Sequence, residues 1–225
     1  HPPTNPPVPP NFDYGGKAGD LFSDIVFRST DGGVTWGDAT QVFPALNPHE
    51  SALAIDSHDG DHLLIMTRVQ HGLRHGENAE EMMRITGNPK PSYKQGALFE
   101  STDGGRTFQL VKGGLTSWYG HRGSVSWADN GVVVVNHQKN PGKGESRHDR
   151  TLVARISLDG GKNWVDGTRS GTSFMNQSTK LVLATDKALT APTVSISPDH
   201  FVSAYFQGED LVNAVLWHIE RKSDN

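Results

Sequence analysis

Short apolar runs alternate with polar turns along most of the chain. Leu63 to Met66, Val132 to Val135 and Phe201 to Phe206 are such runs, and each follows a turn that contains an aspartate. Runs of this length bounded by turn residues are typical of buried β-strands. No stretch approaches the roughly 18 apolar residues that a membrane-spanning helix requires. The pattern therefore predicts an all-β protein.

Three segments share the pattern Ser-x-Asp-Gly-Gly-x-x-aromatic and each follows a short strand pattern. They are Ser29 to Trp36, Ser101 to Phe108 and Ser157 to Trp164. In such a segment the aspartate accepts backbone N–H groups, the two glycines supply positive φ, and the aromatic side chain can bury itself below the hairpin. We therefore expect Asp31, Asp103 and Asp159 to fold turns and not to act as catalytic carboxylates.

A second repeat has the same period. His49 to Ile55 begins eighteen residues after Asp31, and His121 to Trp127 begins eighteen residues after Asp103, so both landmarks recur after 72 residues. Thr190 to Ile196 is a looser third copy. Self-similarity at a fixed spacing indicates stacked copies of one supersecondary unit.

The three segments resemble the Asp-box (BNR) repeat of the sialidase superfamily. The resemblance implies a β-propeller of four-stranded antiparallel blades, in which each box joins the third and fourth strands on the face opposite the active site. About three and a half blades are visible, at residues 20–46 (partial), 49–118, 121–188 and 190–225 (partial), after a proline-rich extended arm at 1–19.

A complete propeller of this type has six blades, so the number visible here is too small. A fragment of a larger propeller, completion by a second chain, and a small atypical propeller all remain open. We favour the first two together, because an open propeller exposes sheet surface and is expected to seek a partner.

The face opposite the boxes is predicted to gather side chains that can carry chemistry. Candidates for catalytic roles are His49, Glu50, His71, Tyr119, His121 and Tyr205, and candidates for substrate binding are Arg68, Arg84, Arg122, His137, Gln138 and Gln207. Arg122 begins an inner strand, where a guanidinium could bind a substrate carboxylate bidentately. The pairs His49/His71 and His121/His137 are expected to bracket the first two strands of successive blades, where each could act as acid and base or bind a metal.

Several arginine and histidine side chains near the boxes are expected to be exposed to solvent. They are Arg28 and Arg106, beside the boxes, and His58, His62 and His200, on turns at the same face.

No zinc, calcium or phosphate-loop motif is present. No cofactor is therefore expected, and the histidine spacing does not indicate a divalent metal. The net charge of −4 without a Lys/Arg block does not favour a nucleic-acid partner.

The resemblance implies a secreted or periplasmic exo-glycosidase acting on terminal acidic sugars of glycans. In a sialidase the nucleophile is a tyrosine activated by a glutamate, roles that Tyr119 or Tyr205 and Glu50 could fill. The Phe/Tyr-Arg-Ile-Pro element that opens a sialidase catalytic domain is missing, and Arg84-Ile85-Thr86 only partly matches it. Two alternatives stay open: a lyase using His, Tyr and Arg on a uronate polymer, and a non-catalytic propeller that binds glycans or proteins.

Overall fold

The computed structural model describes residues 24–42, 48–72, 92–115, 121–139, 151–164, 181–184, 188–189, 192–207 and 211–220. Every regular element in these ranges is a β-strand, which confirms the predicted all-β class. No helix among the described residues is long and apolar enough to cross a membrane. The predicted arm at 1–19 lies outside the described residues.

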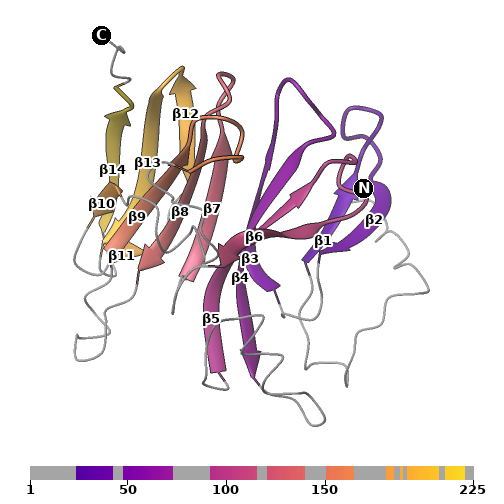
Figure 1. Ribbon diagram of the computed structural model, residues 1–225, viewed down its shortest axis with the longest axis horizontal. Coiled ribbons are helices and arrows are strands. Elements are labelled where there is room, and N and C mark those ends of the chain that lie inside the picture. The colour runs from indigo at the N-terminus through magenta and orange to yellow at the C-terminus, as the bar shows by residue number, and fades with distance from the viewer. Residues whose placement is uncertain are drawn as a thin grey trace.

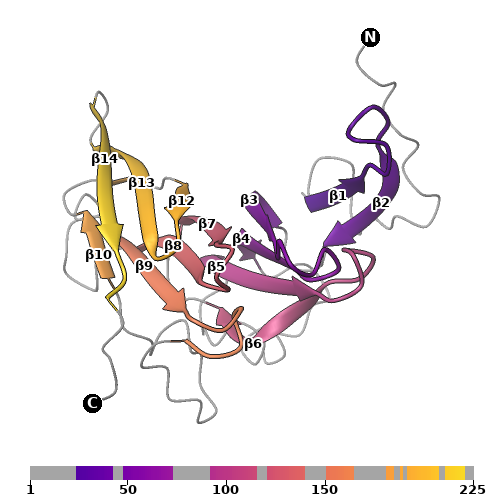
Figure 2. The ribbon, with the colours of Figure 1, turned by 90° about the horizontal axis from the view of Figure 1, so that it is seen from above.

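The strands form four antiparallel sheets that follow one another in chain order (Figures 1 and 2). The first sheet has two strands, β1 (Asp24–Arg28) and β2 (Gly37–Val42). The second contains β3 (Pro48–Ile55), β4 (Leu63–Gly72), β5 (Ser92–Ser101) and β6 (Gln109–Leu115). The third contains β7 (His121–Trp127), β8 (Val133–Lys139), β9 (Thr151–Ser157) and β10 (Leu181–Ala184). The fourth contains β11 (Ala188–Leu189), β12 (Thr193–Ser197), β13 (His200–Gln207) and β14 (Leu211–His218).

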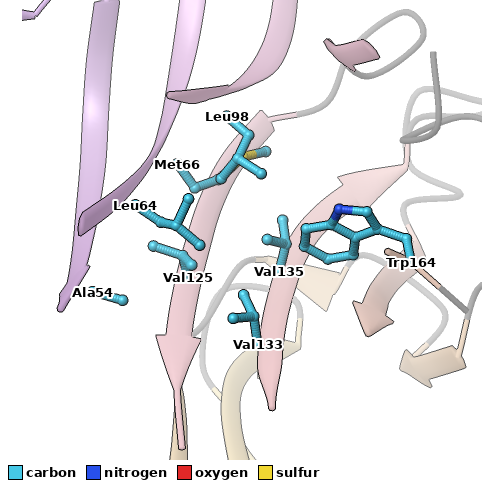
Figure 3. Close-up of a cluster of buried hydrophobic side chains, with 8 residues drawn as sticks. All are labelled: Ala54, Leu64, Met66, Leu98, Val125, Val133, Val135 and Trp164. Carbon is cyan, nitrogen blue, oxygen red and sulfur yellow. The ribbon is translucent and has the colours of Figure 1, made fainter. Parts of the chain in front are cut away.

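Side-chain alternation along each strand buries both faces of the second and third sheets. The cluster between these two sheets consists of Ala54, Leu64, Met66, Leu98, Val125, Val133, Val135 and Trp164 (Figure 3). The cluster between the first and second sheets is built on Val42, Ile65, Ala97 and Phe99. The cluster between the third and fourth is built on Ala128, Val132, Val134, Ala154 and Phe201. The core is therefore a series of layers between consecutive sheets.

Polar links accompany two of these apolar layers. Asp24 of the first sheet accepts hydrogen bonds through Oδ2 from the hydroxyls of Ser51 and Thr67 of the second, the latter at 2.8 Å. Between the third and fourth sheets, Asn136 donates to Thr193 Oγ1, which lies 2.5 Å from Ser203 Oγ. Buried polar groups need such partners, so each link favours one arrangement of neighbouring sheets.

The inner strand of each larger sheet carries one extra residue at the same level. Four residues of β3, from His49 to Ala52, match three residues of β4, from Arg68 to Met66. Four residues of β7, from His121 to Ser124, match three residues of β8, from Gln138 to Asn136. The fourth sheet breaks its inner strand there, between β11 and β12, with the same one-residue shift along β13. This repeated irregularity is a β-bulge, which bends a strand and re-aims its side chains.

The three Asp-Gly-Gly turns share one hydrogen-bond pattern. The first residue, a serine, accepts a bond from the second glycine N–H at 2.7 or 2.8 Å in every copy. The aspartate Oδ1 accepts a backbone N–H four residues on, at 2.8 Å for Asp31, 2.9 Å for Asp103 and 2.6 Å for Asp159. The glycines have positive φ of 71–90°. The terminal aromatic side chains differ: Trp164 is 5% exposed and Trp36 is 49% exposed.

The structure corrects two expectations at this end of the sheets. Arg28 is largely buried, because Nε donates to Gly104 O at 2.6 Å and Nη2 donates to Thr40 Oγ1. It ties the first sheet to the second Asp-Gly-Gly turn. His62 is also largely buried, 2.7 Å from Glu100 and edge-on to Trp127 at 4.6 Å between ring centroids. Contacts with a neighbouring sheet remove both side chains from the solvent.

The outer face of the fourth sheet is apolar and uncovered among the described residues. Its exposed side chains are Val194, Ile196, Phe206, Val212 and Leu216. They alternate with residues that face the third sheet, such as Phe201 and Ser203. Exposed apolar side chains gathered on one sheet face are typical of a contact surface with other protein.

Candidate functional site

The ends of the inner strands remote from the Asp-Gly-Gly turns carry the candidate residues. The strands β3 and β7 begin at this end, and β4, β8 and β13 finish there. The bulges lie at the same level. The sequence-predicted candidates within the described ranges lie on these five strands.

Glu50 and Arg68 form an ion pair at the bulge of β3. Arg68 Nη1 lies 3.1 Å from Glu50 Oε2, and the arginine side chain is largely buried. Arg68 Nε has no hydrogen-bond partner among the described residues. Glu50 adopts φ of 54°, in the left-handed region that costs a non-glycine residue roughly 1–2 kcal/mol. Strain of this kind persists where the surrounding structure enforces it, which is often a functional site.

His137 and Arg155 form a second pair, inside the layer between the second and third sheets. His137 is 4% exposed and Arg155 is 1% exposed. Arg155 Nε donates to His137 Nε2 at 3.0 Å. Burial lowers the pKa of Arg155 to about 10, since desolvation disfavours the charged guanidinium. The group stays protonated at neutral pH.

Two candidates lie at the end of β13. Tyr205 is partly buried and pairs with Asn213 of β14. The amide of Asn213 donates to Gln207 Oε1 at 2.9 Å. This bond occupies one acceptor of Gln207 and leaves its amide NH₂ group as the donor that could meet a ligand.

The remaining candidates are placed only in part. The backbones of His49, His71, His121, Arg122 and Gln138 lie in β3, β4, β7 and β8, but their side chains are outside the described residues. Tyr119 and Arg84 are outside them altogether. Their roles remain predictions.

The strand register separates the two histidine pairs that the sequence suggested were equivalent. His49 pairs with Arg68, and His121 pairs with Gln138. His137 therefore corresponds to Thr67, one residue before Arg68, and not to His71. The repeated arrangement that favoured a histidine pair in each blade is not exact. Within the described ranges, no group of three or more His, Cys, Asp or Glu side chains could hold a metal ion.

A hollow of about 350 Å³ lies between β3, β7 and β12. Its walls are formed by Leu53–Ile55, Val125–Asp129 and Thr193–Ser195. None of the candidate residues lines it, so it does not belong to the site at the strand ends.

Arg155 was missed by the sequence reasoning. It is the one charged residue in the strand Thr-Leu-Val-Ala-Arg-Ile-Ser, at a position that faces the neighbouring sheet. A charge on the buried face of an apolar strand was the available signal.

Comparison with known proteins places the fold. No protein-family model and no curated protein matches the sequence. Among solved structures, Hadza microbial sialidase Hz136 is similar with a TM-score of 0.57 at 16% identity, over 87% of this chain and 39% of the sialidase. A glycosyl hydrolase from Bacteroides ovatus matches with a TM-score of 0.39 at 15% identity, over 76% of this chain and 46% of the hydrolase, which is too weak to support an argument.

The chain spans less than half the length of either protein. At this identity the likeness to the sialidase concerns the fold alone. The chain has an all-β fold of stacked antiparallel sheets, consistent with a partial β-propeller that resembles a sialidase.

Proposed function

We propose that the chain is part of a carbohydrate-active enzyme of the sialidase type, an exo-glycosidase that acts on terminal acidic sugars of glycans. The fold likeness to a sialidase supports this class of protein. The chemistry of the strand ends supports an anionic substrate. The strand-end chemistry is independent of the fold likeness, because it concerns only side chains of this chain.

The Glu50–Arg68 pair carries the proposal. A guanidinium has five N–H donors in a planar fork. Arg68 contacts Glu50 through Nη1, and its buried Nε has no hydrogen-bond partner among the described residues. The bulge places a strained glutamate against a largely buried arginine at the open end of the inner strands. An arginine held in this way is suited to bind the carboxylate of an acidic sugar.

The reaction requires further groups near the anomeric carbon. A carboxylic acid would protonate the leaving oxygen, and a nucleophile or an activated water would attack the anomeric carbon. We assign the candidate nucleophile role to Tyr119 or Tyr205, with Glu50 as the activating carboxylate. Arg84, Arg122, Gln138 and Gln207 are proposed to contact substrate, and His49, His71 and His121 to assist proton transfer.

The Asp-Gly-Gly turns are proposed to be Asp boxes, and the four sheets to be blades of a larger propeller. The uncovered apolar face of the fourth sheet supports a further sheet beyond it, from a longer chain or a second chain. Such a protein would be secreted or periplasmic, where its glycan substrates occur.

The test compares hydrolysis of fluorogenic glycosides that carry terminal acidic or neutral sugars. Arg68→Met is expected to lower kcat/KM for an acidic substrate at least about tenfold, since a hydrogen bond to a charged group contributes about 1.5–3 kcal/mol. Arg68→Lys should keep part of the activity. The matched control is Arg106→Met, an exposed arginine in the second Asp-Gly-Gly turn, which should change nothing.

Two outcomes would replace the proposal. An unsaturated product that absorbs in the ultraviolet, formed from a uronate polymer, would identify a lyase. Glycan binding without turnover, unaffected by Arg68→Met, would identify a binding protein with its site elsewhere.

A further inference from the structure

A buried charge stands where neighbouring sheets place apolar side chains. Arg155 lies on β9 opposite Val135, so it faces the second sheet. In the second sheet the corresponding residue of the third strand is Phe99, opposite Ile65 and fully buried. A buried ion costs several kcal/mol of desolvation unless its surroundings compensate. Arg155 therefore takes a position that an apolar side chain fills in the second sheet.

The contact with His137 restricts that histidine to one form. A guanidinium can only donate hydrogen bonds. Because Arg155 Nε donates to His137 Nε2, this ring nitrogen must carry a lone pair. A neutral imidazole then holds its proton on Nδ1. If the ring were protonated, its Nε2–H would face the Nε–H of Arg155, so two donors would point at each other. Two positive charges would then also lie side by side in a buried layer.

Two further charged side chains, Arg68 and Glu50, belong to this end of the layer. His137 alternates with Val133 and Val135 on β8 and faces the second sheet. On the facing strand β4, Arg68 alternates with Leu64 and Met66 on the side that faces the third sheet, and Glu50 pairs with it. The Arg68–Glu50 ion pair therefore belongs to the same end of this layer as Arg155 and His137.

We propose that Arg155 is a positioning residue that fixes His137 in the neutral Nδ1–H tautomer and in one ring orientation at the end of β8. In this form Nδ1 can donate a hydrogen bond at the strand ends but cannot act as a base. Nε2 is occupied by Arg155 and is not free to bind a metal. The role of His137 in a functional site rests on the proposed function, whereas the assignment of its tautomer does not.

The experiment records imidazole nitrogen shifts in two-bond ¹H–¹⁵N spectra of the ¹⁵N-labelled protein. Loss of one of the eleven histidine patterns in His137→Gln assigns the signal. The expected pattern is neutral Nδ1–H, unchanged over roughly pH 5–8, the range in which an ordinary histidine gains its charge. Arg155→Met should convert it to Nε2–H or to an averaged pattern that titrates. Arg106→Met should leave it unchanged.

A wild-type His137 that shows Nε2–H, or that titrates normally, would overturn the proposal, as would an unchanged pattern in a folded Arg155→Met variant. If Arg155→Met does not fold, Arg155→Lys and the wild-type spectrum decide. These signals do not depend on glycan turnover. A protein inactive on every glycoside would refute the proposed function and leave the tautomer result standing.

Discussion

Gly123 of β7 lies directly against Met66 of β4, so the third sheet packs closely on the second at this point. A Cβ built on Gly123 would lie 2.4 Å from Met66 Cγ and 2.8 Å from Met66 Cε. Ordinary carbon contacts lie at about 3.5–4.0 Å. Cγ is near the backbone, so the methionine cannot avoid the clash by moving only its tip. Gly123→Ala should therefore destabilise the protein.

The magnitude follows from overpacking, which costs about 1–3 kcal/mol of unfolding free energy. Met66 is fully buried, so Met66→Ala alone should cost about 2–5 kcal/mol through the cavity it leaves. In the Met66→Ala background the new methyl group of Gly123→Ala has space. In that background the cost of Gly123→Ala in unfolding free energy should fall to zero or become a gain of about 0.4–1 kcal/mol, because alanine has less freedom than glycine in the unfolded chain.

The assay is urea unfolding followed by tryptophan fluorescence, with the four variants of a double-mutant cycle. Gly60→Ala is the control, since a Cβ there meets nothing within 4 Å. We expect a coupling of about 1–3 kcal/mol between the two positions. If the changes in unfolding free energy caused by Gly123→Ala and Met66→Ala add to within about 0.5 kcal/mol, the close packing of the two sheets at this point is refuted.

Three further outcomes are expected. Hydrogen bonds, first from the Thr35 side chain and then from its N–H, lower the pKa of Asp31 from 3.8 to about 2. The ionised turn is thus stabilised above pH 3.8, and this contribution should be lost as the pH falls towards 2; the amide shift of Thr35 should report it, and a midpoint near 4 would contradict it. Phe201→Ala should cost about 3–5 kcal/mol in urea unfolding, because the ring is fully buried; a loss below 1 kcal/mol would refute the layer between the third and fourth sheets. Leu216→Glu, on the uncovered face, should change stability by less than about 0.5 kcal/mol and reduce self-association in light scattering; unchanged association in a protein that self-associates would count against the face as a contact surface.

The strands and turns were predictable because their signals are local. The Asp-Gly-Gly pattern contains its own hydrogen-bond partners, so Asp103 binds the N–H of Thr107 within the same turn. Apolar runs such as Val132 to Val135 are buried wherever the sheets stack. Neither prediction required knowledge of a distant residue.

Features created by two sheets together were not predictable in the same way. Arg28 and His62 lie beside turns and have polar side chains, which favoured exposure. Arg28 is covered by Gly104, 76 residues away in the chain, and His62 by Trp127 of the third sheet. The one-residue shift at Glu50 has no composition signal either. The histidine spacing also gave no sign that His71 lies three residues beyond Arg68, the partner of His49, whereas His137 lies one residue before Gln138, the partner of His121.

The repeated bulge has an evolutionary consequence. Inserting one residue reverses the alternation of side chains along the rest of a strand. Ala52 and Ser124 keep their pairing with the core strands below the bulge, whereas His49 and His121 follow an independent register above it. Substitutions, and even small length changes, at the outer ends can alter which ligand is recognised while the layered core keeps its alignment. One scaffold can in this way be adapted to different ligands without being refolded.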